Sequence, residues 1–108
     1  MIADLKKDGL FLTPNGLATE RLTSPYYQTK GYWRGPIWAP STMIIADGLE
    51  AAGETGFTRE LRLRFCRMAA KSGFPENYHA VSGRPQDDPS YTWTSSVFLI
   101  FAHQLLQK

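Results

Sequence analysis

The segment 92–107 is apolar nearly all round, and this feature constrains the fold more than any other. Either Thr92 or Thr94 can cap a helix that runs to about Gln107. A helix without a wide polar face has to pack against several neighbours. The rest of the sequence offers only two other good helices, so we expect the chain to be part of a larger domain or of an oligomer. The apolar positions of this segment are Val97, Phe98, Leu99, Ile100, Phe101, Ala102, Leu105 and Leu106.

Two helical segments precede it. The first is predicted from residue 42 to about residue 52, with Ser41 as its N-cap. The second, over 58–72, has Thr58 as its N-cap, apolar side chains along one stripe and arginines on the other side. Gly73 follows it as a stop signal. This second segment is the clearest amphipathic helix in the chain.

Between residues 9 and 40 the chain is too heavily punctuated for regular helix. Loops longer than about 12–15 residues in compact domains tend to be functional, and aromatic side chains give this one a reason to be ordered. Two short strands fit within 10–34, and residues 1–8 look like the last turns of a helix that Gly9 ends. We therefore predict one all-α segment over 1–108 with a long aromatic-rich loop region. The punctuating residues are Pro14, Asn15-Gly16, Pro25, Gly31, Gly35-Pro36 and Pro40.

Composition argues against several classes of function. Lys and Arg number 12 against 10 Asp and Glu, and the arginines alternate with apolar rather than aromatic residues, so we expect no nucleic-acid partner. The single cysteine, Cys66, rules out an internal disulfide and most simply packs as a small hydrophobe. No Cys/His spacing suits zinc, and Asp87-Asp88 fits a turn better than a calcium loop. No metal or cofactor is predicted.

The sequence also carries no recognisable targeting or membrane segment. Charges alternate at the N-terminus before any apolar stretch can form. The longest strongly apolar run, 97–102, is far shorter than the ~20 residues of a membrane span. We expect a cytoplasmic protein with no membrane partner, unless a targeting signal lies in a part of the protein outside this sequence.

A carboxylate between aromatic residues is the strongest catalytic signal. Glu76 lies in Gly73-Phe74-Pro75-Glu76-Asn77-Tyr78, just past a predicted helix end. Glycoside hydrolysis needs two carboxyl groups, one to protonate the leaving oxygen and one to activate water or to attack the anomeric carbon. Glu76 fits the second role. We therefore predict a sugar site with Glu76 as its base, walls from Trp33, Trp38 and Tyr78, and hydroxyl partners in Arg34 and Asn77.

Each of these residues also has an ordinary structural explanation. Glu76 could be a solvated loop carboxylate or a helix-capping group. Trp33 and Trp38 could pack in the core, because tryptophan buries a large area in any case. Arg34 could serve as an ion-pair partner. His79 has no partner serine or carboxylate in a triad-like order. We therefore expect it, at most, to support residues of the site without touching the substrate.

Four motifs in order resemble the C-terminal part of glycoside hydrolase family 63-like enzymes, with family 37 trehalases as more distant relatives. The resemblance implies an (α/α)6 toroid, inversion at an α-glycosidic bond and Glu76 as general base, with Trp33, Arg34 and Trp38 lining the subsites. It also implies that the general acid, an aspartate, lies upstream of this region. The motifs are Tyr32-Trp33-Arg34-Gly35-Pro36-Ile37-Trp38, Gly48-Leu49 with Ala51-Ala52-Gly53, Glu76-Asn77-Tyr78 with Ser82-Gly83, and Tyr91-Thr92-Trp93-Thr94-Ser95.

Two hypotheses follow. In the first, the chain is a segment of an inverting α-glycosidase that acts on α-glucosidic or α-mannosidic bonds of an oligosaccharide or a small α-glycoside, and is inactive by itself. In the second, it is a non-catalytic helical module that binds a partner or forms a homo-oligomer through its apolar helix faces.

Overall fold

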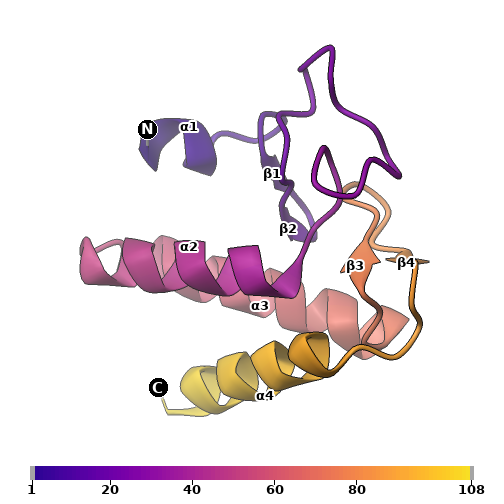
Figure 1. The fold of residues 1–108 in the computed structure, drawn as a ribbon. Coiled ribbons are helices and arrows are strands. Elements are labelled where there is room, and N and C mark those ends of the chain that lie inside the picture. Colours follow the sequence, from indigo (N-terminus) through magenta and orange to yellow (C-terminus); the bar gives the residue numbers. More distant parts are fainter. Residues whose placement is uncertain (1, 108) are drawn as a thin grey trace.

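The computed structural model describes residues 2–107, in which three long helices pack together beneath a loop region (Figure 1). Helices α2 (Ala39–Ala51) and α3 (Thr55–Ser72) form an antiparallel hairpin joined by residues 52–54. Helix α4 (Thr92–Leu106) packs against both and runs in the same direction as α2. The starts of α2 and α4 and the end of α3 therefore meet at one end of the helices, on the right of Figure 1. The all-α prediction is confirmed.

Two small hairpins complete the fold. Strands β1 (Leu12–Thr13) and β2 (Gly16–Leu17) pair antiparallel, as the sequence predicted for two short strands within 10–34. Strands β3 (Asn77–Tyr78) and β4 (Pro85–Gln86) form a second antiparallel pair, which the sequence analysis did not anticipate. A short helix α1 (Ile2–Lys6) matches the helical end predicted over 1–8, except for Met1, which lies outside the described residues.

The core is built around one phenylalanine of α3. The ring of Phe65 meets Tyr78 and Phe101 edge-on, with ring centroids 5.7 and 5.6 Å away, and all three side chains are fully buried. Such edge-to-face pairs add to the stabilisation that comes from burial alone. Cys66 lies beside this core, and burial raises the pKa of its thiol to about 11, as expected for a packed, unreactive cysteine.

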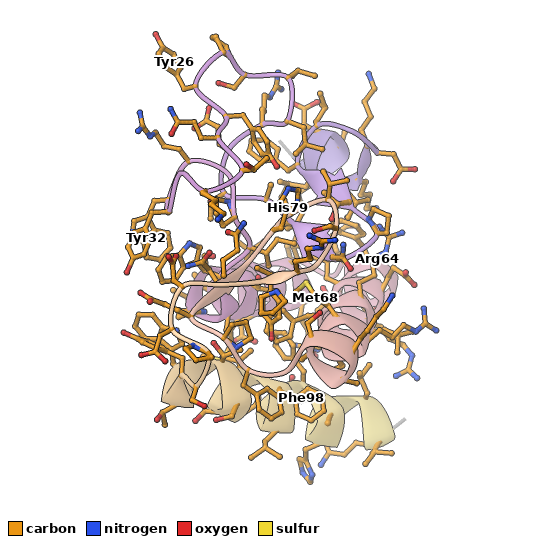
Figure 2. The ribbon with its side chains drawn as sticks, turned by 90° about the vertical axis from the view of Figure 1, so that its right-hand side faces the viewer. Tyr26, Tyr32, Arg64, Met68, His79 and Phe98 are labelled. Atoms are coloured by element: carbon orange, nitrogen blue, oxygen red, sulfur yellow. The ribbon has the colours of Figure 1, made fainter. Side chains whose placement is uncertain are left out.

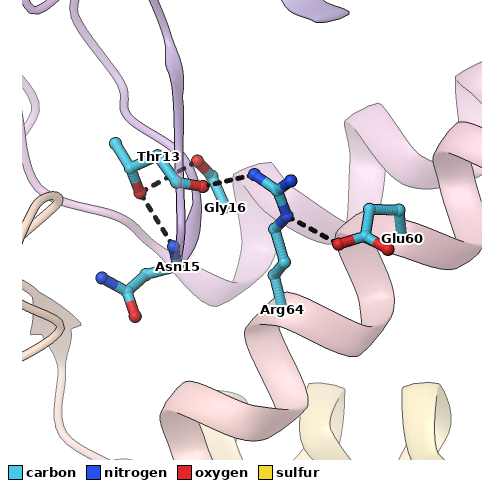
Figure 3. A network of polar contacts seen from close by, with 5 residues as sticks. All are labelled: Thr13, Asn15, Gly16, Glu60 and Arg64. Carbon is cyan, nitrogen blue, oxygen red and sulfur yellow. Dashed lines mark hydrogen bonds and ion pairs between the residues drawn. The ribbon is translucent and has the colours of Figure 1, made fainter. Parts of the chain in front are cut away.

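An arginine of α3 ties the β1–β2 hairpin to the helices (Figure 3). The Arg64 guanidinium donates from Nη1 to the Thr13 carbonyl at 2.7 Å and from Nε to the Glu60 carboxylate at 2.8 Å. The Thr13 hydroxyl lies 2.7 Å from the Ala80 carbonyl and accepts a hydrogen bond from Asn15 N–H at 3.0 Å. Arg64 of α3 thus binds the hairpin, and Thr13 of the hairpin in turn binds the chain that follows β3.

The predicted N-caps of the first two long helices are wrong. Helix α2 begins at Ala39 behind an extended Trp38, because Pro40 is well tolerated in a first helical turn. The Ser41 hydroxyl instead donates back to the Trp38 carbonyl at 3.2 Å. Helix α3 begins at Thr55, and Thr58 lies inside it with its hydroxyl donating to the Glu54 carbonyl at 2.7 Å.

Helix α4 forms where the sequence predicts it, but neither threonine caps it. Tyr91 occupies the N-cap position without a side-chain hydrogen bond, and the buried Thr94 hydroxyl donates to the Pro75 carbonyl at 2.6 Å. One face of α4 packs on α2 and α3, while Leu99 and Leu106 are 66% and 85% exposed. Within residues 2–107 no helix is both long enough and apolar enough to cross a membrane.

Loss of the hydrogen bond between Thr94 and the Pro75 carbonyl should lower the stability of the fold. We expect Thr94→Val to lower the free energy of unfolding by about 1–3 kcal/mol, because an isosteric side chain would leave the buried Pro75 carbonyl without its donor. Urea unfolding followed by circular dichroism measures this. Thr92→Val, at an exposed position of the same turn, is the control and should unfold near the wild-type midpoint. Equal midpoints for the two variants would contradict the role of the bond.

Candidate active site

The predicted site residues gather where α2 begins and α3 ends. A backbone bridge makes this junction: Ile37 N–H donates to the Tyr78 carbonyl at 2.8 Å, and Tyr78 N–H donates to the Ile37 carbonyl at 2.9 Å. Trp38 follows Ile37 directly, and Glu76 lies two residues before Tyr78. The bridge therefore brings the tryptophan motif and the glutamate loop side by side, although they are far apart in sequence.

An aromatic cluster forms one part of the site. Trp33 stacks on Trp38 with ring centroids 3.8 Å apart and planes inclined by 15°. Tyr32 and Trp93 meet Trp38 edge-on at 4.6 and 5.9 Å. Trp38 is fully buried beneath its neighbours, whereas Trp33 is 49% exposed. The cluster therefore has a buried floor, Trp38, and an accessible rim, Trp33.

Glu76 lies beside this cluster in a half-buried position. Its Oε2 accepts a hydrogen bond from the Tyr32 hydroxyl. Its Oε1 lies 3.5 Å from the Asp88 N–H, and its own N–H donates to the Asp88 carbonyl at 2.7 Å. The backbone and one carboxylate oxygen of Glu76 are thus both held in place.

The same contact changes the acidity of Tyr32. The hydrogen bond to Glu76 raises the pKa of the Tyr32 phenol to about 12, with smaller contributions from desolvation and from the charges of Glu76, Tyr91 and Asp87. Tyr32 also has a backbone φ of 64°, in the left-handed region that bulky residues rarely adopt. It is thus unusual in both its acidity and its backbone.

The structure places Tyr78 and Asn77 beneath the site rather than on its walls. Both side chains are fully buried. The Tyr78 hydroxyl donates to the Gly73 carbonyl at 2.6 Å, and burial raises the pKa of this phenol. The Asn77 amide donates to the Asp87 carboxylate at 2.7 Å, while its buried Oδ1 has no hydrogen-bond partner among the described residues. Both residues hold the glutamate loop from the inside.

The other predicted residues lie at the surface. Arg34 is exposed, its backbone closes turns with Gln28 and Gly31, and its guanidinium takes part in none of the ion pairs that residues 2–107 form. The His79 ring accepts the N–H groups of Val81 and Ser82 at 3.2 and 3.1 Å, so it organises the loop behind the site.

A groove of about 670 Å³ opens next to the aromatic cluster, between the first turns of α2 and α4. Asp88 and Trp93 border it, and Met43, Val97 and Ile100 give it an apolar floor. In the described part of the chain, no group of three or more His, Cys, Asp or Glu residues is placed to hold a metal ion.

The predicted site residues do not include Tyr32 and Trp93, which the structure places in the aromatic cluster. Both stand in motifs that the resemblance used, so a signal was present. The contact of Tyr32 with Glu76 depends on a left-handed backbone, and the place of Trp93 depends on the packing of α4 beside α2. No periodic pattern in the sequence predicts either of these two features.

A carboxylate that accepts a hydrogen bond beside stacked tryptophans, at one end of a helical array, is an arrangement suited to a carbohydrate-active helical enzyme. Residues 1–94 match the family model of the mannosylglycerate hydrolase MGH1-like glycoside hydrolase domain, and the chain belongs to this family. The resemblance to family 63-like enzymes is thereby confirmed.

Curated relatives agree with this assignment. A mannosylglycerate hydrolase of Thermus thermophilus is 25% identical over 79 residues, which is 73% of this chain and 19% of that protein. The glucosylglycerate hydrolase of Mycolicibacterium hassiacum is 30% identical over 80 residues, or 71% of this chain and 18% of that protein. The chain thus spans about a fifth of the length of these relatives.

Solved structures show the same fold. The GH63 mannosylglycerate hydrolase from Thermus thermophilus in complex with Tris aligns with a TM-score of 0.79 at 22% identity, covering 91% of this chain and 23% of that one. The structure of that enzyme in complex with glucose aligns with a TM-score of 0.68 at 25% identity, over 75% and 19% of the two chains. The predicted fold, a helical-hairpin segment of an (α/α)6 glycosidase, is confirmed.

The contact between Tyr32 and Glu76 predicts a pH dependence. We expect Tyr32 to ionise at about pH 12 in the folded chain and at lower pH in Glu76→Gln, because an amide accepts the Tyr32 hydrogen bond more weakly than a carboxylate and carries no charge. The carbon shift of the Tyr32 hydroxyl-bearing ring atom, assigned with Tyr32→Phe, measures this. Since the pKa is raised on folding, the stabilisation is complete below about pH 10 and is lost as pH rises towards 12. The same ionisation pH in both proteins would contradict the contact.

Proposed function

We propose that residues 1–108 form one segment of the catalytic domain of an inverting glycoside hydrolase, and that Glu76 is its general base. The observation that carries the proposal is the position of Glu76, whose carboxylate is fixed against an aromatic cluster with an accessible rim. A solvated loop carboxylate would not need a hydrogen bond from Tyr32 to its Oε2, nor one from its own backbone N–H to the Asp88 carbonyl.

The reaction proposed for this site is a single displacement. The Glu76 carboxylate takes a proton from water while the water oxygen bonds to the anomeric carbon. The glycosidic C–O bond breaks on the opposite side, and the leaving oxygen receives a proton from the general acid. In an inverting enzyme the two carboxyl groups are ~6.5–9.5 Å apart. The family resemblance assigns the acid to an aspartate outside this segment.

The surrounding residues have separate proposed tasks. Trp33 is half exposed and offers a flat apolar surface to the C–H face of a sugar ring, with the buried Trp38 as its support. The exposed Arg34 next to it is a donor for sugar or aglycone oxygens. Asn77 and Tyr78 are buried, so their proposed task is to hold the loop that carries Glu76.

The proposed substrates are small α-glycosides of glucose or mannose. Relatives named as mannosylglycerate and glucosylglycerate hydrolases support a glycerate aglycone. A neighbouring structure that holds Tris and D-glycerate, and another that holds glucose, support the same class of ligand.

The test of the proposal is Glu76→Gln in the full-length polypeptide that carries this segment. We expect kcat on mannosylglycerate or glucosylglycerate to fall by about 10²–10⁴-fold, the contribution of a general base. The control is Glu20→Gln, since Glu20 takes part in none of the ion pairs found within residues 2–107. We expect it to hydrolyse at the wild-type rate.

Proton NMR of the wild-type reaction reports both the rate and the stereochemistry. Inversion at an α-linkage releases the β-anomer first. An initial α-anomer would contradict the inverting mechanism, and a Glu76→Gln enzyme of unchanged kcat would contradict the role of Glu76 as base.

The exposed apolar faces of α2 and α4 support a second candidate function, that of a non-catalytic module. Ile44 on α2 and Leu99 on α4 are 70% and 66% exposed, and Ile100 borders the groove between these helices. Apolar surface of this kind favours association. Light scattering separates the candidates: a stable dimer of this chain that Leu99→Glu dissociates supports the module, and a monomer counts against it.

A further inference from the structure

Tyr32 has a left-handed backbone conformation that burial of its side chain does not explain. It is 45% exposed, so burial does not account for the left-handed φ of 64° in a bulky residue. Such conformations persist only where the surroundings enforce them, and they gather at functional sites.

The surroundings that enforce this conformation come mainly from Trp38. The indole Nε1 donates to the Tyr32 carbonyl at 2.6 Å, and the two rings meet edge-on at 4.6 Å. Trp38 is fully buried at the N-cap of α2 and therefore acts as a fixed anchor. On the other side, Gly31 N–H donates to the Gln28 carbonyl at 3.0 Å and closes the turn that precedes Tyr32.

This anchored backbone directs the Tyr32 hydroxyl at Glu76, where it donates to Oε2. The other oxygen, Oε1, makes only the 3.5 Å contact with Asp88 N–H among the described residues, which is long for a hydrogen bond. The two carboxylate oxygens are therefore not equivalent: one is occupied and the other is free to accept.

We propose that Tyr32 is the positioning residue of the general base: its hydroxyl holds Oε2 of Glu76 and leaves Oε1 as the oxygen that takes the proton from the attacking water. This inference rests on the proposed function of Glu76 and adds a second residue and an oxygen assignment to it. Fixing the carboxylate before substrate binds lowers the reorganisation that the transition state requires.

The raised pKa of Tyr32 fits this task. A phenol with a pKa of about 12 remains protonated at every pH at which a carboxylate base works, so it is always a donor. A histidine or a lysine in the same place would bring a charge to the site.

The experiment is Tyr32→Phe in the full-length polypeptide, assayed with mannosylglycerate and glucosylglycerate. The phenylalanine ring preserves the packing on Trp38, and the Trp38 indole still holds the backbone carbonyl. We expect kcat to fall by about 10- to 100-fold, as for the loss of a hydrogen bond to a charged group, with KM changed less than about twofold. The thermal unfolding midpoint should fall only by the small amount expected for one surface hydrogen bond, too little to unfold the enzyme under assay conditions.

A matched control is Tyr26→Phe, because Tyr26 is 67% exposed and lies at the tip of the loop region, well away from Tyr32 (Figure 2). Wild-type kcat and KM are expected for this variant. A fall in the unfolding midpoint of Tyr32→Phe that accounts for its lost activity would overturn the inference, because a structural role would then suffice.

The double variant Tyr32→Phe with Glu76→Gln decides whether Tyr32 acts through the base. We expect it to be no slower than Glu76→Gln alone, because Tyr32 then has no carboxylate base left to position. Losses that multiply would overturn the inference. If Glu76→Gln keeps full activity, the proposed function fails. If Glu76→Gln is inactive and Tyr32→Phe is fully active, only the role of Tyr32 fails.

Discussion

The backbone bridge between Ile37 and Tyr78 is the contact on which the site depends. Both residues are fully buried, so the two hydrogen bonds are shielded from water and breaking either would leave a buried polar group without a partner. The bridge fixes the start of α2 against the chain that follows α3. Because Tyr78 also packs on Phe65, the core of the helical array sets the position of the glutamate loop.

The glutamate loop is held from the side of α4 as well. Thr94 donates to the Pro75 carbonyl, and the Tyr91 N–H donates to the Phe74 carbonyl at 2.9 Å. The loop that carries Glu76 therefore has contacts with the start of α2, the end of α3 and the start of α4. A site supported by three helix ends keeps its geometry better than a free loop would. This explains how an irregular segment, bounded by glycine and proline, can present a carboxylate in one orientation.

Apolar periodicity predicted the three long helices, and Gly73, with φ of 86°, ends α3 as expected. The helix starts were misplaced because Ser41 and Thr58 hydrogen-bond backwards to carbonyls of the preceding turn, and such hydroxyls look like caps in a sequence. The meeting of Glu76 with the tryptophans was predicted. That Tyr78 points into the core was not, because a two-residue strand shows no alternation that would tell its inner face from its outer one.

The unusual apolarity of α4 and the arrangement of the proposed site have one physical explanation. An inverting site needs carboxyl groups on opposite sides of the sugar, so a segment with the base supplies only one wall. The groove beside Trp93 is open, and its floor continues into exposed apolar side chains of α4 such as Ile100. Covering that surface with further helices would bury apolar area and enclose the groove in the same step. Under the proposed function, the packing of further helices on α4 would therefore both stabilise the fold and close the site.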